Sequence, residues 1–247
     1  MCRHLAYLGP PRAVGDLLFD APHSLREQGC APREMVVAKD NPDGWGVAWW
    51  SPDAHEPHHY RTTTRMWDDT TFAAADAPAA AALGAVRKAS PNTTLNPVNN
   101  APFVAATRVG VIAFSLNGHA YHPSCKPQIV AALEPDAQLV GDTDSEALFA
   151  LVRARIAAGM EPATAVAAVH HVIDPGPDVY VNLLLVTADQ IVATTWQHSL
   201  YVRQSDGATT VASEALDSDP AWERIPDAHL LVATADHRTI TPLEGLR

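Results

Sequence analysis

The second residue, Cys2, carries the side chain best suited to nucleophilic chemistry. Removal of the initiator Met1 before this small side chain would leave Cys2 with a free α-amino group. An α-amine titrates near about 7.7–8.0, so it can accept the proton of the adjacent thiol at neutral pH, where a lysine cannot. Cys2 would then supply nucleophile and base from one residue. A cysteine at position two is, however, more often an accident of sequence.

A second thiol, Cys125, follows His119 and His122 at three-residue intervals. This H-x-x-H-x-x-C pattern is open to three interpretations: a zinc site, a thiol paired with an imidazole, or a buried structural cysteine. Gly118 and Pro123 interrupt a helix there, and no C-x-x-C pair follows to complete a zinc site. The structural interpretation is therefore favoured, and no metal is expected.

Asn117 and Gly118 come directly after an apolar run that is typical of a buried strand. An amide side chain beside a glycine at a strand end can aim its NH₂ group and a backbone N–H at one point. That arrangement is what an oxyanion hole requires. An Asn-Gly pair is also a common hairpin signal, so a plain turn is the alternative.

Two charged residues are suited to binding a small polar molecule. Arg87 follows an apolar stretch, and its guanidinium can bind a carboxylate through two parallel hydrogen bonds. Asp144 lies in the first turn of an expected helix, where its carboxylate could bind an ammonium group. Simpler interpretations exist for both residues: a solvated basic pair with Lys88 for the first, and helix capping for the second.

In this order, these segments resemble the class II glutamine amidotransferase domain of the N-terminal nucleophile hydrolases. The matching segments are Cys2, Asp43-Gly44-Trp45-Gly46, Arg87-Lys88-Ala89-Ser90, Asn117-Gly118 and Asp142-Thr143-Asp144-Ser145-Glu146. The resemblance continues more loosely through 181–183 and 212–214. It implies an α+β fold, the four-layer αββα sandwich of N-terminal nucleophile hydrolases.

The resemblance also implies catalytic roles. The Cys2 thiolate would attack a γ-glutamyl carbonyl, and the α-amine of the same residue would relay the proton. Asn117 and the backbone N–H of Gly118 would stabilise the oxyanion.

Binding roles follow from the resemblance as well. Arg87 would bind the α-carboxylate of the glutamyl group, Asp144 its α-ammonium, and Ser90 would be a further substrate-binding residue. Two departures affect this region. Ser90 and Pro91 stand where many members carry threonine and histidine, and 40–42 replace an arginine that often precedes the aspartate-glycine turn.

Within the family, the segments 41–50, 86–103, 115–120 and 142–152 are most similar to stand-alone amidohydrolases of ergothioneine biosynthesis. This similarity implies γ-glutamyl-hercynylcysteine sulfoxide as the substrate and hydrolysis by water. Two alternatives remain: a glutaminase subunit that supplies ammonia to a partner synthetase, and a non-catalytic binding protein with this fold. The implied substrate bears a trimethylammonium group, which the faces of aromatic side chains can bind. Five aromatic residues could serve, unless they belong to the core: Trp45, Trp49, Trp50, Trp67 and Tyr121.

The elements that must position these residues follow from hydrophobic patterning. Strands are expected at 2–9, 46–50 and 109–116, and in several segments from residue 179 onward. Helices are expected at 14–19, 72–83, 143–158 and 162–172. Thr143 and Glu146 have the spacing of a capping box. Together these elements indicate two packed sheets covered by helices, in a single domain spanning 2–247.

The composition excludes several partners. The 247 residues are 47% hydrophobic, enough for a sizeable core. Seventeen basic against 28 acidic residues give a net charge of −11, which argues against nucleic acid. Neither a membrane span nor a signal peptide is evident, and three cysteines are a sparse, odd set. We expect a cytoplasmic enzyme acting on a small molecule, without cofactor, membrane or obligatory protein partner.

Overall fold

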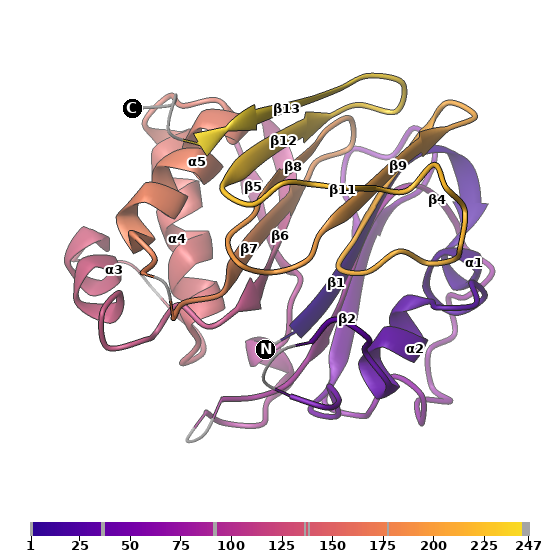
Figure 1. Ribbon diagram of the computed structural model, residues 1–247, viewed down its shortest axis with the longest axis horizontal. Coiled ribbons are helices and arrows are strands. Elements are labelled where there is room, and N and C mark those ends of the chain that lie inside the picture. The colour runs from indigo at the N-terminus through magenta and orange to yellow at the C-terminus, as the bar shows by residue number, and fades with distance from the viewer. Residues whose placement is uncertain are drawn as a thin grey trace.

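The structure is a computed structural model that describes residues 2–35, 38–90, 93–135, 137, 139–176 and 178–243. Two antiparallel β-sheets pack face to face, and helices cover the outer face of each sheet (Figure 1). Within the described residues, no helix combines the length and the apolar character needed to cross a bilayer.

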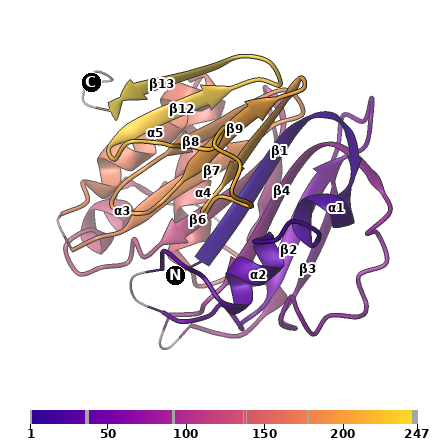
Figure 2. The ribbon, with the colours of Figure 1, turned by 45° about the vertical axis from the view of Figure 1, so that its right-hand side comes forward.

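The first sheet contains the N-terminal strand near its centre. Within the described residues its order is β11 (Glu223–Arg224), β9 (Tyr201–Ser205), β10 (Ala208–Ala212), β1 (Cys2–Ala13), β4 (Pro78–Arg87), β2 (Trp45–Trp50) and β3 (His58–Thr62). Its outer face is covered by two helices, α1 (Val14–Leu18) and α2 (Leu25–Cys30) (Figure 2).

The second sheet supplies the opposite wall. Within the described residues its order is β13 (Arg238–Pro242), β12 (His229–Ala233), β8 (Ile191–Thr194), β7 (Val181–Val186), β6 (Gly110–Gly118) and β5 (Phe103–Thr107). Three helices cover it: α3 (Lys126–Ala132), α4 (Asp144–Ala157) and α5 (Pro162–Ile173). A short 3₁₀ helix at Pro97–Asn99 precedes β5.

Three apolar layers hold this arrangement together. One lies between the sheets and includes Ala6, Leu83 and Leu184, while the other two lie between each sheet and its helices. Helices on both outer faces of two stacked sheets make the four-layer αββα sandwich that the sequence predicts. The predicted fold class is therefore confirmed.

The helix predicted at 72–83 is wrong, because β4 begins at Pro78 and runs in the middle of the first sheet. Its alanines are small partners for large neighbours: Ala82 lies opposite Trp49 and Ala81 opposite Trp50 on β2. The helix propensity of alanine is a weak preference, and packing against tryptophans on the adjacent strand overrides it.

Other strand and helix boundaries differ from the predicted ones for local reasons. The strand predicted to end at Gly9 continues to Ala13, with an irregularity in its pairing between Leu8 and Arg12. That irregularity accommodates two prolines, which cannot donate to a regular ladder. Helices α2 and α3 and strands β3, β5 and β11 were not predicted; α3 begins only after the Gly118 and Pro123 that were expected to interrupt a helix.

Candidate active site

The pairing of β1 with β4 positions the nucleophile candidate. Ala6 and Leu8 lie in the layer between the sheets, and alternation along the strand puts Cys2 on the same face. Cys2 is the register partner of Arg87, so these two side chains leave neighbouring strands on one face. The structure thus brings together two residues that are 85 positions apart in the sequence.

Asn117 approaches Cys2 from the other sheet. It lies near the end of β6, fully buried, and its Oδ1 accepts a hydrogen bond of 3.3 Å from the Cys2 backbone N. The next residue, Gly118, has a φ of +149°, and a Cβ there would lie 1.9 Å from the Tyr180 carbonyl oxygen. Only glycine fits at this corner, so the predicted amide-glycine pair stands beside the chain terminus.

Arg87 is buried without an acidic partner. Its Nη1 donates to Asn100 Oδ1 at 3.3 Å and its Nη2 to Thr93 Oγ1 at 3.2 Å. Among the described residues, no carboxylate lies within 4.0 Å of this guanidinium, although Arg87 is only 7% exposed. A buried charge held only by neutral acceptors is suited to pair with a carboxylate from outside the protein.

The predicted aspartate-glycine turn fixes this arginine. The Asp43 N–H donates to the Arg87 carbonyl at 3.0 Å, and the Arg87 N–H donates to the Gly44 carbonyl at 2.8 Å. Gly44 has a φ of +113°, and a Cβ there would lie 2.2 Å from Asn100 Nδ2. A side chain at position 44 would therefore displace the residue that holds the guanidinium.

Ser90 and Asp144 meet at His119. The Ser90 hydroxyl lies 3.3 Å from His119 Nδ1, and the same nitrogen lies 3.6 Å from Asp144 Oδ2. Asp144 Oδ2 also accepts from the backbone N–H groups of Ala120 and Tyr121, at 2.7 and 3.3 Å. These contacts fix the carboxylate at the start of α4 beside the loop that follows β6. Pro91 lies outside the described residues.

The capping box at this helix is only half formed. Thr143 accepts the Glu146 N–H at 3.2 Å, as predicted. The Glu146 carboxylate instead accepts from the N–H groups of Val140 and Gly141. It therefore closes the loop before α4 rather than its first turn.

The possible zinc ligands do not form a site. His119 faces Asp144, while His122 Nδ1 lies 2.8 Å from Ser124 Oγ. Cys125 is fully buried in the core beneath α3. No group of three potential ligands in the described part of the chain could hold a metal ion. The structural interpretation of Cys125 agrees with its position.

The tryptophans of β2 belong to the core. Trp45, Trp49 and Trp50 are each at most 6% exposed, and Trp45 packs against Tyr60 and Phe72. They offer no face to a ligand, so the core interpretation holds for them. Tyr121 is half buried beside Asp144, and Trp67 lies close to α2.

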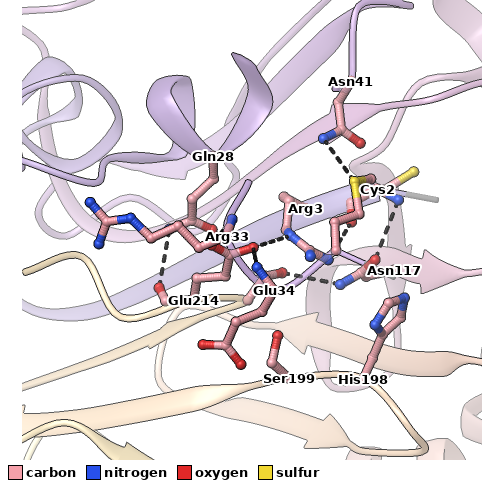
Figure 3. A network of polar contacts seen from close by, with 12 residues as sticks. Cys2, Arg3, Gln28, Arg33, Glu34, Asn41, Asn117, His198, Ser199 and Glu214 are labelled. Atoms are coloured by element: carbon pink, nitrogen blue, oxygen red, sulfur yellow. Dashed lines mark hydrogen bonds and ion pairs between the residues drawn. The ribbon is translucent and has the colours of Figure 1, made fainter. Parts of the chain in front are cut away.

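Sequence reasoning missed a buried ionic network on the other face of β1. Arg3 Nε lies 2.9 Å from Glu214 Oε1, and both residues are at most 1% exposed (Figure 3). His23 Nε2 lies 2.6 Å from Glu214 Oε2, and the backbone N–H groups of Arg33 and Glu34 donate to the same carboxylate. The only feature of the sequence that pointed to this network was Arg3, a charged residue inside an apolar strand.

This network sets the charge of Glu214. Burial alone would raise the pKa of the carboxyl, but the hydrogen bond with His23, the charge of Arg3 and the two backbone donors lower it to about 2. Nearby, burial and the charge of Arg3 lower the pKa of both His4 and His198 to about 3. An ionised carboxylate and two neutral imidazoles therefore surround the N-terminal strand at neutral pH.

Solved structures with this architecture identify the fold. Glutamine phosphoribosylpyrophosphate amidotransferase from Bacillus subtilis matches 98% of the chain with a TM-score of 0.74 and 14% identity, although the chain spans about half (49%) of that protein. A glutamine aminotransferase class-II domain protein from Silicibacter pomeroyi matches over 98% of this chain and 99% of its own, with a TM-score of 0.65 and 20% identity. The fold is that of the class II glutamine amidotransferases, as the sequence resemblance implied.

Relatives in sequence identify the family to which the chain belongs within this fold. The γ-glutamyl-hercynylcysteine sulfoxide hydrolase of Mycolicibacterium smegmatis is 33% identical over 246 residues, which cover 98% of this chain and 100% of the relative. The protein of the same name from Mycobacterium tuberculosis is 32% identical over 250 residues, 99% and 97% of the two chains. No family model matches the chain. At this identity and coverage, the chain belongs to the γ-glutamyl-hercynylcysteine sulfoxide hydrolase family.

Proposed function

We propose that this chain hydrolyses the γ-glutamyl amide bond of γ-glutamyl-hercynylcysteine sulfoxide and releases glutamate in ergothioneine biosynthesis. The names of its relatives support the substrate. The observation that carries the chemistry is the pairing of Cys2 with a buried Arg87 that has no acidic partner among the described residues, beside Asn117. We further propose that 2–247 act as one cytoplasmic domain after loss of Met1, which lies outside the described residues, with no cofactor, nucleic acid or obligatory protein partner.

Binding begins at the charged end of the glutamyl group. Arg87 offers a guanidinium to the α-carboxylate, and Asp144 offers a carboxylate to the α-ammonium. Ser90 adds a hydroxyl at the same place, 3.3 Å from His119. A cationic and an anionic side chain that bind the two charged groups would select an α-amino acid head group and orient its γ-carbonyl.

Acylation needs no group beyond Cys2 and the amide-glycine corner. The thiol proton passes to the α-amine of Cys2, and the sulfur forms a bond to the γ-carbonyl carbon. Asn117 Nδ2 and the Gly118 N–H stabilise the resulting oxyanion. As the tetrahedral species collapses, the C–N bond breaks and the ammonium returns its proton to the leaving amine. A glutamyl thioester remains on Cys2.

Deacylation reverses the roles of the same groups. The free α-amine takes a proton from water as the water oxygen bonds to the thioester carbonyl. The C–S bond then breaks, the thiolate recovers the proton, and glutamate leaves. The overall reaction consumes one water and makes one carboxylate and one amine.

The test compares Cys2→Ala with Cys30→Ala, since Cys30 is an exposed thiol of the same chain. We expect glutamate release from the sulfoxide substrate, followed by mass spectrometry, to be lost in Cys2→Ala and retained in Cys30→Ala. Intact mass of the active protein should show that Met1 is absent. Retained activity of Cys2→Ala would contradict the mechanism.

The same assay decides between the alternatives. Faster turnover of free glutamine than of the sulfoxide, with stimulation by a synthetase, would favour the ammonia-supplying subunit. Failure of a glutamine-directed affinity label to modify Cys2, with no turnover of any γ-glutamyl amide, would favour a binding protein.

A further inference from the structure

Ser213 links β10 to both residues of the proposed nucleophile centre. It is fully buried directly after β10, and its Oγ accepts from the backbone N of His4 at 2.9 Å and from Asn117 Nδ2 at 3.2 Å. The same hydroxyl donates to the carbonyl of His4 at 3.3 Å. Ser213 therefore ties the first residues of β1 to the end of β6 in the opposite sheet.

The hydrogen-bond count at this hydroxyl determines how the Asn117 carboxamide is oriented. A serine hydroxyl has one proton and two lone pairs. Its proton is committed to the His4 carbonyl, so only a lone pair faces Asn117. The carboxamide must then turn its NH₂ group toward Ser213, and its oxygen toward the backbone N of Cys2, 3.3 Å away. The reverse orientation would set oxygen against a lone pair and lose both bonds.

We infer that Ser213 is a positioning residue for the reaction, an inference that rests on the proposed function. With the carboxamide oxygen fixed toward the terminus, the α-amine of Cys2 donates to Asn117 Oδ1 and keeps its lone pair for the thiol proton. Among the described residues, Asn117 Nδ2 donates only to Ser213 Oγ, so its second N–H is available for the oxyanion. One hydroxyl thus orients both the base and half of the oxyanion hole.

The variant Ser213→Ala removes the acceptor that holds this orientation. The carboxamide can then turn its NH₂ group toward the α-amine, engage the lone pair and favour the neutral amine. We expect kcat to fall by about 10- to 100-fold, with KM within about twofold. The acidic limb of kcat/KM should move to lower pH by about half a unit or more.

Ser115→Ala is the matched control. Ser115 is equally buried and also bonds His4, through Nδ1 at 2.8 Å, but no contact of its hydroxyl with Asn117 is present in the described residues. Its loss should leave the acidic limb where it is in the wild type. Equal displacement of the limb in both variants would mean that the effect is structural and would overturn the inference.

A second measurement does not depend on the substrate. Alkylation of Cys2 by iodoacetamide, followed across pH on the N-terminal peptide, reports the thiol and its α-amine, with exposed Cys30 as reference in the same sample. We expect the pH dependence of the Cys2 alkylation rate to shift in Ser213→Ala and that of Cys30 to remain unchanged. If wild-type protein shows no hydrolysis, the proposed function fails, while this profile still decides whether Ser213 controls the surroundings of the Cys2 thiol and its α-amine.

Folding of each variant is checked by thermal unfolding. Should Ser213→Ala not fold, Ser213→Cys under reducing conditions replaces it, because sulfur has a similar shape and is a weaker acceptor. The same shift, of smaller size, is expected. A folded Ser213→Ala or Ser213→Cys protein with wild-type kcat and wild-type pH profiles would refute the positioning role.

Discussion

Two buried arginines on neighbouring strands of the first sheet have opposite surroundings. Arg3 on β1 is fully buried and forms an ion pair of 2.9 Å with Glu214. Arg87 on β4, opposite Cys2, is nearly as buried but contacts only the neutral oxygens of Asn100 and Thr93 within the described structure. Among the described residues, Glu214 neutralises the guanidinium of Arg3, whereas no carboxylate neutralises that of Arg87.

In the proposed function, this difference separates a structural charge, Arg3, from a substrate-binding charge, Arg87. A buried cation is costly unless an anion compensates it. Glu214 compensates Arg3 at all times, and it simultaneously holds the backbone at Arg33 and Glu34. In the proposed function, the α-carboxylate of the substrate supplies the anion for Arg87. Removing either charge should therefore affect different measurements, stability for the first and substrate affinity for the second.

The largest expected effect is on stability, in Glu214→Gln. The change removes the ion-pair partner of buried Arg3 and replaces an acceptor oxygen by a donor, so the free energy of unfolding should fall by about 3–5 kcal/mol. Urea denaturation measures this loss. Glu34→Gln is the control: its half-buried carboxylate contacts Tyr201, and its loss should cost about 1 kcal/mol or less.

The pH dependence of this difference has a defined sign. The pKa of Glu214 is lowered to about 2 in the folded chain, against 4.5 as its ordinary value. The ionised carboxylate therefore stabilises the fold fully above about pH 4.5, and the contribution is lost as pH falls from 4.5 through 2. The gap in unfolding free energy between wild type and Glu214→Gln should narrow over that range. A gap independent of pH would contradict an ionic role.

The second effect is on substrate binding, in Arg87→Met. Loss of a buried guanidinium that pairs with a carboxylate costs about 2–5 kcal/mol, so kcat/KM should fall by about 30-fold or more, mainly through KM. The free energy of unfolding should change little, because removing Arg87 leaves no carboxylate unpaired in the described structure. Arg108→Met, in an arginine that contacts the end of α4, should keep the wild-type KM. A loss of stability in Arg87→Met as large as that of Glu214→Gln, with KM unchanged, would remove the distinction.

The two arginines also show what could be predicted from the sequence. Arg87 was predicted as a site residue because it stands in a short segment, 87–90, that resembles a known family, and Cys2 and Asn117 belong to the same resemblance. The partner of Arg3 is 211 residues away and meets it only through folding of the sheet and its loops, which no local pattern encodes. The helix prediction over the alanines of β4 was wrong for a related reason: these small side chains lie opposite tryptophans of the neighbouring strand, β2. Local motifs therefore indicated the candidate residues, whose roles stay predictions, while pairings between distant segments had to be seen in the structure.

The smallest effect tests how the unpaired arginine is held. Thr93 Oγ1 accepts from Arg87 Nη2 at 3.2 Å and donates to the Ser90 carbonyl at 2.7 Å, so Thr93→Val frees one arm of the guanidinium. Thr93 affects affinity only through the orientation of the guanidinium, so we expect KM to rise by about two- to tenfold with kcat nearly unchanged. Thr94→Val is the matched control, because its hydroxyl bonds Asp142 instead, and KM should stay within about twofold. Steady-state kinetics of the two variants separates them. If both raise KM equally, the loop as a whole, and not the bond to Arg87, sets affinity for the glutamyl group.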